Sequence, residues 1–499
     1  MVYTVAHYIA GKPCIEKSTQ AHDIKNPAQG ETIGRVDFAS DALCATAIAH
    51  AKQAWPNWSE TPAIKRARVL FKFRELLEKY QQDLAQMVTR EHGKTLDDAK
   101  ASVARGIELV EFHCGLISQW QHHFSANVAQ GIDCYSLRQA LGICAGVSPF
   151  NFPVMVPVWM IIPAIACGNA FILKPSEQDP SAPVRLMELL SEAGLPPGIA
   201  QCLQGDKHTV DYLLKAPEIA SFTAVASTPV AESIYQRAIA AGKRAHTFGG
   251  AKNHAVVMPD ANIPQAAQAI VGAAYGSAGE RCMAISVIVA VGDETAEQLL
   301  QELKPRIEAI RIDAGDKPDC DMGPLISQAH RQRVLAAIEQ GVEDGAKLIV
   351  DGRNYTHPHY PQGYFVGPNL FDHVEEHMSI YQQEIFGPVL VIVRVKDFEQ
   401  AIALVNRHPY GNGTAIFTQQ GYFAREYAER VQVGMVGVNV PIPVPMVSHS
   451  FGGWKRSSFG DTFMHGMESI HFYSKLKTVT SKWPISDITE TAFAMTSHR

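Results

Sequence analysis

The stretch AYGSAGERCMA, residues 274–284, contains the strongest candidate for a reactive side chain. Cys282 directly follows the permanent cation Arg281, and most of the other side chains in the stretch are small. A nearby positive charge favours the thiolate over the thiol, and small residues let backbone amides approach a bound ligand closely. The pattern predicts a nucleophilic cysteine in a narrow pocket, with a buried structural cysteine as the alternative.

A second group of polar residues stands at the end of an apolar run. The motif LKPSE (173–177) contains Lys174, Ser176 and Glu177, and it overlaps the end of the run AFILKP (170–175). If the run is a strand of a parallel sheet, these side chains lie at its carboxyl end, where such sheets bind their ligands. An exposed ion pair between Lys174 and Glu177 is the alternative interpretation.

The sequence from residue 141 onward predicts the elements that position these side chains. Residues 181–193 carry apolar side chains at helix spacing and are followed by Gly194, which favours a helix end. Short apolar runs that predict strands lie at 141–150, 170–175 and 220–227. This alternation predicts a parallel sheet covered by helices. No G-x-G-x-x-G motif follows any of the strands, so a nucleotide site would not be of the usual Rossmann type.

The remainder of the chain extends this α/β pattern. Residues 62–123 mix charged and apolar positions at helix spacing, and strands alternate with helices again from 249 to about 440. Residues 471–483 alternate apolar and polar side chains, which predicts a half-exposed strand that can pair with the edge of another subunit. Because 499 residues are too many for one core, we expect two or three domains.

Composition excludes several classes of protein. The 44 basic and 50 acidic residues argue against a partner that is a nucleic acid. The nine cysteines form no C-x-x-C pair and no pattern has metal-site spacing, so we expect a reduced, cytoplasmic protein without a metal. The N-terminus lacks a leader pattern, and the most apolar stretch, residues 154–167, is too short for a membrane span.

Five motifs in one chain resemble those of the aldehyde dehydrogenases. They are SPFNFP (148–153), LKPSE (173–177), GSAGERC (276–282), QEIFGPV (383–389) and SFGGWK (450–455). Within that family the chain is most similar to the CoA-acylating methylmalonate-semialdehyde dehydrogenases. The stretches that carry this similarity are GAKNH (250–254), GERCMA (279–284), VGVNVPIPVP (436–445) and FYSKLKTVTSKW (472–483).

The resemblance implies an α/β fold with a Rossmann-like cofactor domain, an α/β catalytic domain and a small β oligomerisation extension. The expected boundaries are 1–123 and 140–248 for the NAD-binding domain, 249–440 for the catalytic domain, 124–139 and 471–499 for the extension, and 441–470 for a return segment to the cofactor domain. It also implies a homotetramer or a dimer.

The resemblance assigns roles to particular residues. It makes Cys282 the nucleophile, whose thiolate adds to an aldehyde carbonyl, and it makes Asn151 an oxyanion donor together with the backbone N–H of Cys282. On its own, Asn151 beside proline would be interpreted as a turn residue. The residues expected to bind NAD are Phe150, Phe152, Lys174, Ser176, Glu177, Ser227, Glu384 and Phe386.

Two features bear on that cofactor site. A carboxylate at Glu177 accepts hydrogen bonds from ribose hydroxyls and repels a 2′-phosphate, which favours NAD over NADP. Many relatives carry a Gly-Ser step where this chain has Ala226-Ser227, and a later glycine where it has Ala231. Each replacement adds a methyl group near the expected position of the pyrophosphate or the adenine.

The second half of the reaction depends on a missing base. Aldehyde dehydrogenases that hydrolyse their thioester use a glutamate 34 residues before the cysteine, and this chain has Phe248 there. Water has a pKa of about 15.7 and needs a base, whereas a thiol with a pKa of about 8.5 is partly ionised at pH 7. We therefore expect coenzyme A as the acyl acceptor. The alternative is hydrolysis, with Glu280 as a replacement base.

Two arginines complete the expected site. In the similar enzymes Arg281, and a second arginine that matches Arg105, bind a substrate carboxylate, for which a guanidinium has suitable bidentate geometry. Arg105 shares a predicted helix face with Leu109 and Phe112, although a surface position is an equal alternative. The substrates implied are methylmalonate and malonate semialdehyde, and the products propionyl-CoA and acetyl-CoA. A catalytically silent binding protein of the same fold is a further alternative, against which Cys282 and Asn151 argue.

Overall fold

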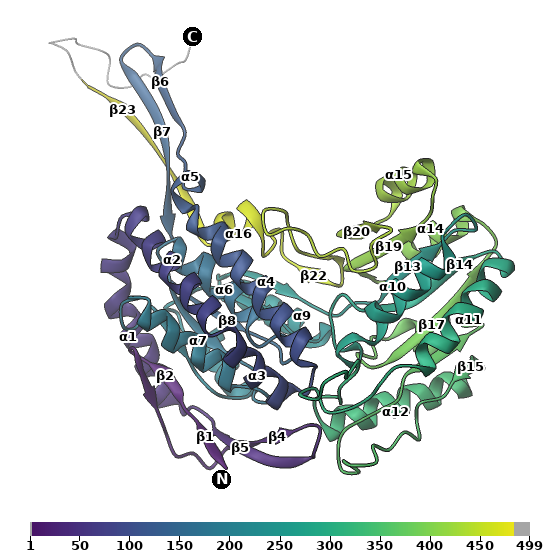
Figure 1. Cartoon of the computed structure of the whole chain (residues 1–499). Helices are drawn as coiled ribbons and strands as arrows, with labels where there is room; N and C mark the ends of the chain where they lie inside the picture. The colour runs from purple at the N-terminus through teal and green to yellow at the C-terminus, as the bar shows by residue number, and fades with distance from the viewer. Residues whose placement is uncertain (1, 484–499) are drawn as a thin grey trace.

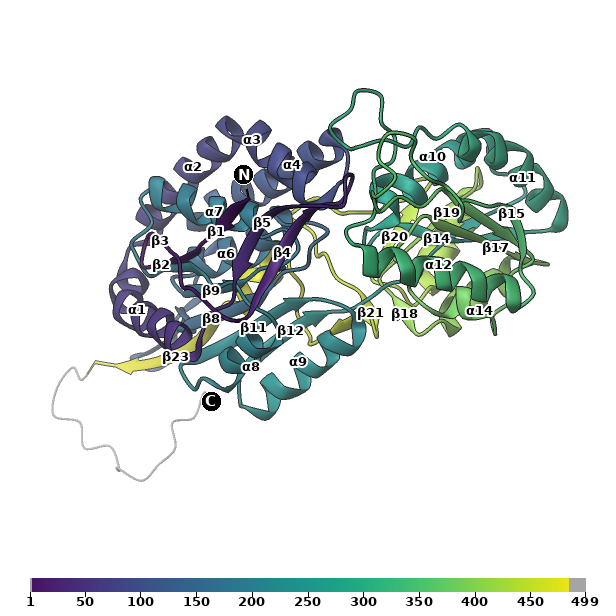
Figure 2. The ribbon, with the colours of Figure 1, turned by 90° about the horizontal axis from the view of Figure 1, so that it is seen from below.

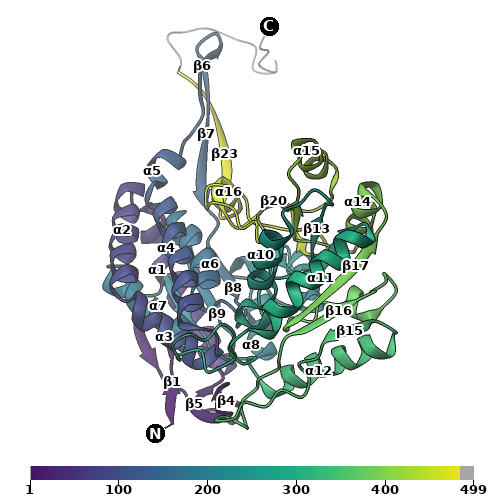
Figure 3. The ribbon, with the colours of Figure 1, turned by 45° about the vertical axis from the view of Figure 1, so that its right-hand side comes forward.

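The computed structural model describes residues 2–483 of the chain. It consists of two α/β lobes and a narrow β-sheet that projects from the first lobe (Figure 1). Figures 2 and 3 show the same lobes from two further directions, with the segment near residues 250–440 forming the second lobe. This is the mixed α/β arrangement that the sequence predicts.

The first lobe is built on an eight-stranded sheet. Its order is β22 (Ser458–Phe459), β12 (Arg244–Phe248), β11 (Ile219–Val225), β8 (Ile143–Val147), β9 (Ala170–Lys174), β10 (Ala200–Cys202), β2 (His7–Ile9) and β3 (Lys12–Cys14). The five strands from β12 to β10 are parallel. Because β8 is followed by β9 on one side and β11 lies on its other side, the strand order reverses there, and ligands of open α/β sheets bind at such a point.

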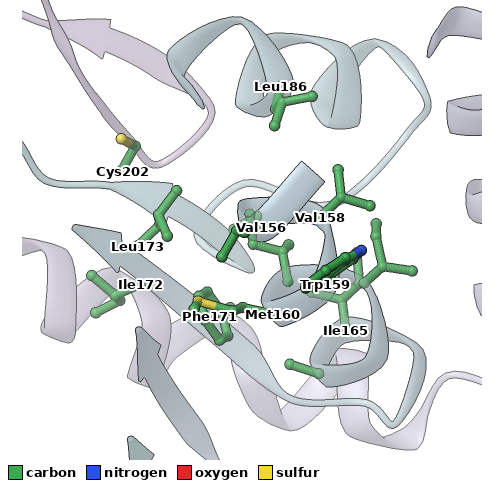
Figure 4. Packing of buried hydrophobic residues seen from close by; sticks show 14 of the residues in the cluster. Val156, Val158, Trp159, Met160, Ile165, Phe171, Ile172, Leu173, Leu186 and Cys202 are labelled. Atoms are coloured by element: carbon green, nitrogen blue, oxygen red, sulfur yellow. The ribbon is translucent and has the colours of Figure 1, made fainter. Parts of the chain in front are cut away.

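Helices cover both faces of this sheet. They are α1 (Asp41–Glu60), α2 (Ala63–Lys79), α3 (Gln81–His92), α4 (Leu96–Cys114), α5 (Leu116–Gln119), α6 (Met155–Ala166), α7 (Ser181–Glu192), α8 (Lys207–Lys215), α9 (Thr228–Ala240) and α16 (Gly466–Phe472). All twelve residues of α6 are buried. Its side chains pack between β9 and α7: Figure 4 shows Met160 of α6 beside Phe171 of β9, with Leu186 of α7 on the other side of α6. A Cβ at Gly146 in β8 would lie 2.7 Å from the Phe171 ring, so only glycine allows this close packing.

The second lobe contains a seven-stranded sheet with its own apolar core. The order is β15 (Lys347–Val350), β16 (Asn369–Asp372), β17 (Val389–Val395), β14 (Ile285–Val291), β13 (Asn253–Val257), β19 (Gly413–Phe417) and β20 (Met435–Val438), all parallel except β15. Its helices are α10 (Ile263–Tyr275), α11 (Asp293–Glu308), α12 (Gln328–Glu343), α13 (Ser379–Gln382), α14 (Phe398–Arg407) and α15 (Gly421–Arg430). The buried residues under the two sheets form two separate clusters.

The projecting sheet has the order β23 (Ser474–Lys482), β7 (Ile132–Ala140) and β6 (Phe124–Ala129). Strands β23 and β7 pair over nine residues, from Ser474 opposite Ala140 to Lys482 opposite Ile132. Phe124 and Leu476 are exposed on it. Two smaller sheets are β1 (Tyr3–Val5) with β5 (Glu31–Asp37) and β4 (Ala21–Asn26), and β18 (Tyr410–Gly411) with β21 (Trp454–Lys455). Residues 484–499 of the expected extension lie outside the described residues.

Candidate active site

The loop that carries Cys282 leaves α10 through an unusual backbone. The short 3-10 turn η1 (Gly276–Gly279) contains Ser277 and Ala278, with φ of 54° and 51°, and Gly279, with φ of 76°. Left-handed conformations at residues other than glycine are strained, and they persist only where the surroundings hold them. A Cβ at Gly279 would lie 2.2 Å from the backbone oxygen of Gly387, so the loop is packed directly on that segment.

Two asparagine amides fix the backbone of Cys282. The carbonyl oxygen of Cys282 accepts from Nδ2 of Asn253 at 2.9 Å and from Nδ2 of Asn412 at 3.0 Å. The side-chain oxygen of Asn253 accepts in turn from the backbone N–H of Gly413 at 3.0 Å. The sequence did not identify either asparagine as a site residue. Asn253 lies in the stretch GAKNH (250–254), whereas no motif around Asn412 indicates a site residue.

The thiol of Cys282 lies in a cavity between the loop and the segment 384–389. Residues that line this cavity include Asn253, Arg281, Cys282, Glu384 and Phe386. Burial, and to a smaller extent the charge of Glu384, raise the pKa of the Cys282 thiol to about 12. Burial thus favours the neutral thiol, and nothing in the structure supports the expected stabilisation of a thiolate by Arg281.

The guanidinium of Arg281 is engaged elsewhere. Its Nη2 lies 2.5 Å from Oδ1 of Asp98, near the start of α4. The pair is largely buried, with side-chain exposed fractions of 21% for Arg281 and 14% for Asp98. An ion pair of this kind neutralises the charge that the sequence suggested would act on the cysteine.

Arg105 lies on the same helix as Asp98 but makes a different contact. Its Nη1 is 2.7 Å from Oε2 of Glu108, and 39% of its side chain is exposed. Seven residues separate Asp98 from Arg105, which places both on one face of α4, about 10 Å apart along the axis. The structure thus brings the expected carboxylate-binding arginines to one helix face, each with an acidic partner.

Asn151 occupies the loop between β8 and α6, with 3% of its surface exposed. Its Nδ2 donates to the backbone oxygen of Glu280 at 3.1 Å, two residues before Cys282. Its own carbonyl accepts from Nζ of the buried Lys94 at 2.7 Å. Nδ2 carries two hydrogens, and the bond to Glu280 uses one of them. The sequence did not identify Lys94.

Glu280 does not reach the cavity. Its Oε1 accepts from the backbone N–H of Ile326 at 3.1 Å, and its side chain is completely buried near His92 and His330. Burial raises the pKa of this carboxyl well above its ordinary value. Glu280 is not among the described residues that line the cavity, so the structure gives no support to Glu280 as a replacement base.

Phe248, at the position of the missing base, is the last residue of β12 and is 6% exposed. Its ring packs in the core of the first lobe, 5.3 Å from the ring of His246. Of the described residues that line the Cys282 cavity, Glu384 supplies the one carboxylate. Burial raises the pKa of Glu384 to about 7, and its Oε1 accepts from the backbone N–H of Ala251 at 2.8 Å.

The expected cofactor residues fall into two groups. At the carboxyl end of β9, Nζ of Lys174 lies 2.9 Å from Oε2 of Glu177. Burial alone would raise the pKa of Glu177, but the charge and hydrogen bond of Lys174 lower it below its ordinary value. Ser176 uses its hydroxyl to accept from the backbone N–H of Gln178, and Ser227 is the exposed N-cap residue of α9.

Aromatic residues form the second group, beside the cysteine. The rings of Phe150 and Phe386 meet edge to face at 5.9 Å, and Nζ of Lys94 lies 4.2 Å from the Phe152 ring centre. Phe386 has φ of 58°, and its carbonyl accepts from Nε2 of His330 at 2.7 Å. The segment that carries Glu384 is thereby fixed against α12.

Two observations test whether these residues fit a dinucleotide. The carboxyl ends of β8, β9 and β11 lie together at the point where the strand order reverses, and the hydroxyl of Ser148 is buried there without a partner. The methyl group of Ala231 is buried in α9, whose first turn exposes Ser227, so this methyl lies inside the lobe. Ala226 is half-buried. The hydrogen-bond donors of Ser148 and Lys174, together with the carboxylate of Glu177, fit a ribose and a phosphate group.

The chain belongs to the aldehyde dehydrogenase family: the model of that family matches residues 14–479. This confirms the family and the fold expected from the sequence motifs. Members of the family are oxidoreductases, and the Cys282 loop, Asn151 and the reversal point of the first sheet lie within the matched range.

Particular relatives are similar over nearly their whole length. A malonate-semialdehyde dehydrogenase from Pseudomonas aeruginosa is 49% identical, over 96% of this chain and 97% of that protein. The human mitochondrial acylating methylmalonate-semialdehyde/malonate-semialdehyde dehydrogenase is 44% identical, over 98% of this chain and 91% of that protein. A crystal structure from Sinorhizobium meliloti, complexed with NAD and provisionally described as a methylmalonate-semialdehyde dehydrogenase, is 52% identical, with a TM-score of 0.96 over 98% of this chain and 99% of that chain.

Residues 2–483 contain neither a metal-binding cluster nor a helix that could span a membrane. Among them no group of three or more histidine, cysteine, aspartate or glutamate side chains is arranged to hold a metal ion. No helix in the same range has the length and apolar character that crossing a membrane requires.

Proposed function

We propose that this protein oxidises methylmalonate semialdehyde, or malonate semialdehyde, with NAD and transfers the resulting acyl group to coenzyme A with loss of carbon dioxide. The observation that carries the proposal is the buried ring of Phe248 at the end of β12, where a hydrolytic enzyme would need a carboxylate. The names of the similar proteins from P. aeruginosa and human support the substrate class.

The first half of the reaction uses Cys282 and Asn151. The thiol gives its proton to solvent water, and its sulfur forms a bond to the aldehyde carbon as the carbonyl π bond breaks, giving a thiohemiacetal whose oxygen is negative. Nδ2 of Asn151 and the backbone N–H of Cys282 are the donors that stabilise this oxyanion. NAD would supply the hydride acceptor for the oxidation of the former aldehyde carbon. In this proposal Lys174, Ser176, Glu177 and Ser227 hold its adenine side, and Phe150, Phe152, Glu384 and Phe386 hold its nicotinamide side.

The thioester on Cys282 then carries a carboxylate on its α carbon. When the bond to that carboxyl group breaks, carbon dioxide leaves and the electron pair forms an enolate on the thioester oxygen, facing the same two donors. A proton added to the α carbon gives the propionyl or acetyl thioester. The thiolate of coenzyme A displaces the Cys282 sulfur, because a thiol is acidic enough to attack without a base.

Arg105 and Arg281 are the proposed partners of the substrate carboxylate. Arg105 pairs with Glu108 and Arg281 pairs with Asp98, so the substrate must share or replace these contacts. The planar guanidinium has five N–H donors and can bind two carboxylates at once. Breaking these ion pairs costs free energy, which only a negatively charged substrate recovers. The site therefore selects an aldehyde that carries a carboxylate.

Hydrolysis to a free acid is a second candidate, favoured by Glu384. Its carboxyl lines the same cavity as Cys282, and burial raises its pKa to about 7, which suits a general base near neutral pH. In our proposal this carboxylate holds the nicotinamide ribose instead.

We also propose that the projecting sheet holds a homotetramer or a dimer together. The nine unpaired cysteines favour a cytoplasmic location.

The proposal is tested by following NADH formation from each semialdehyde with and without coenzyme A, and by identifying the product. We expect sustained turnover and a CoA thioester only when coenzyme A is present. Equal turnover in its absence, with a free acid as the product, contradicts the proposal. Cys282→Ala serves as the control, because it removes the acyl carrier and must abolish oxidation of either aldehyde.

A further inference from the structure

Lys94 is a buried lysine in the short connection between α3 and α4. The stretch HGKT (92–95) explains its place: Gly93, with φ of 94°, ends α3, and the hydroxyl of Thr95 accepts from the backbone N–H of Asp98 in the first turn of α4. Only 1% of Lys94 is exposed. Because an ammonium group that is removed from water is costly unless polar or charged groups bind it, its contacts indicate its role.

Three groups lie close to the ammonium of Lys94, and two of them belong to the loop that carries Asn151. Nζ donates to the backbone oxygen of Asn151 at 2.7 Å and lies 4.2 Å from the centre of the Phe152 ring. The third group is Oδ2 of Asp98, at 3.6 Å. A charged donor forms a stronger hydrogen bond than a neutral one, and an aromatic face attracts a cation. Lys94 therefore binds two successive residues of the loop between β8 and α6.

Asp98 balances the charge of Lys94 and also links it to Arg281. Its Oδ1 lies 2.5 Å from Nη2 of Arg281, and its Oδ2 faces Lys94. Burial alone would raise the pKa of the Asp98 carboxyl, but the charges of Lys94 and Arg281 lower it below its ordinary value. An ionised carboxylate between two cations favours the charged form of both.

The backbone of Lys94 is closely packed and gives these contacts a fixed origin. A Cβ at Gly315 would lie 2.2 Å from the backbone oxygen of Lys94, and the N–H of Leu96 donates to the carbonyl of Gly315 at 2.9 Å. A Cβ at Gly323 would lie 2.1 Å from the oxygen of Gly93. Both of these glycines lie between α11 and α12 of the second lobe. The connection between α3 and α4 is therefore packed backbone to backbone against that lobe.

We propose that Lys94 is a positioning residue, whose ammonium holds the carbonyl of Asn151 and thereby directs the Asn151 side-chain amide at the substrate oxyanion. This inference rests on the proposed function, in which Asn151 is an oxyanion donor. A donor stabilises a developing charge effectively only when it is held in place before the reaction. The amide of Asn151 makes one bond to the backbone oxygen of Glu280, and the bond from Lys94 fixes the backbone of the same residue.

The test is a double-mutant cycle of Lys94→Met and Asn151→Ala, measured as the rate of the first NADH turnover. Methionine is close to lysine in length but has no N–H donor. Loss of one oxyanion donor in Asn151→Ala should slow this turnover about 10²–10³-fold. Displacement of the amide in Lys94→Met should slow it about 10- to 100-fold. The double variant should be at most about twofold slower than Asn151→Ala, because the amide through which Lys94 acts is already absent.

The choice of aldehyde separates this role from an effect through Asp98 and Arg281. An oxyanion forms on malonate semialdehyde and on propanal alike, so Lys94→Met should slow both aldehydes by the same factor. Lys94→Gln keeps an N–H donor without the charge and should lose less activity than Lys94→Met. If Lys94→Met does not fold, the same cycle with Lys94→Gln decides.

Lys243→Met is the matched control. Lys243 is also buried, and its Nζ donates to the carbonyls of Ala216 and Ile219 at 2.6 and 2.9 Å, but it precedes β12 and so lies at the amino edge of the sheet. This variant should unfold at a lower temperature and keep the wild-type first turnover.

Four results would overturn the inference: a wild-type first turnover in Lys94→Met, losses that multiply in the double variant, a loss confined to malonate semialdehyde, or an equal loss in Lys243→Met. A wild-type rate in Asn151→Ala would instead contradict the proposed function, because Asn151 would then not be an oxyanion donor.

Discussion

Gly279→Ala should disable the enzyme without unfolding it. The backbone of Gly279 has φ of 76°, and an added Cβ would lie 2.2 Å from the oxygen and 2.5 Å from the carbon of the Gly387 carbonyl. Contacts of Cβ below 3.0 Å are essentially not found, and both obstructing atoms are backbone. Either the cysteine loop or the segment after Phe386 must therefore move.

The size of the effect follows from this displacement. The required shift is about 1 Å, and a misplacement of that size costs about 10²-fold in rate. The left-handed conformation adds about 1–2 kcal/mol of instability for alanine. We expect the rate of the first NADH turnover and the reactivity of Cys282 toward a thiol reagent to fall about 100-fold, while the protein remains folded.

Gly272→Ala is the matched control for this prediction. Gly272 lies in α10, and a Cβ at this position would meet nothing within 4 Å. Alanine in a helix interior is more stable than glycine by roughly 0.5–1 kcal/mol, so this variant should retain full activity and unfold at a slightly higher temperature. A folded Gly279→Ala enzyme with a wild-type first turnover, or a Gly272→Ala enzyme that is equally impaired, would refute the account of the loop.

Three other predictions concern selectivity, hydrolysis and pH. Arg105→Leu or Arg281→Leu should reduce kcat/KM at least tenfold for methylmalonate semialdehyde but only slightly for propanal, as measured by NADH formation, and equal losses would exclude a carboxylate contact. Phe248→Glu should raise release of free acid without coenzyme A about 10²-fold or more, whereas Phe248→Leu should not; unchanged acid release would contradict the missing-base argument. Burial lowers the pKa of His246 to about 3, so this histidine is neutral in the folded protein but protonates near pH 6.5 when unfolded. Its stabilising contribution is present above pH 6.5 and lost toward pH 3, and the stability difference between His246→Phe and wild type should move by about 1.4 kcal/mol in favour of the variant from pH 7.5 to 5.5, as measured by denaturant unfolding. A constant difference would contradict it.

The sequence predicted the central strands of the first sheet, because buried parallel strands consist of short runs of apolar residues. β8, β9 and β11 coincide closely with the runs at 141–150, 170–175 and 220–227. Side chains at the ends of such runs share one sheet edge, so Lys174 and Glu177 were predictable as neighbours. Their side chains form an ion pair at 2.9 Å, and the two residues are only three positions apart in the chain.

The electrostatic environment of the Cys282 thiol was not predictable, because it depends on distant contacts. Asp98, which binds Arg281, lies 183 residues away in the chain, and Asn412 is 130 residues from the cysteine whose carbonyl it holds. Sequence proximity suggested that Arg281 would favour the thiolate. Burial and the charge of Glu384 instead raise the thiol pKa to about 12. Which way a charged side chain points is decided by tertiary structure.

The acyl group on Cys282 offers the most direct test of the central claim, that the site lacks a base for hydrolysis. The enzyme is mixed with NAD and malonate semialdehyde in the absence of coenzyme A, and the mass of the intact chain is measured over time. We expect an acetyl adduct that persists for many turnover times, maps to Cys282 and disappears when coenzyme A is added. An adduct that is lost equally fast in buffer alone, with acetate released, would contradict the account.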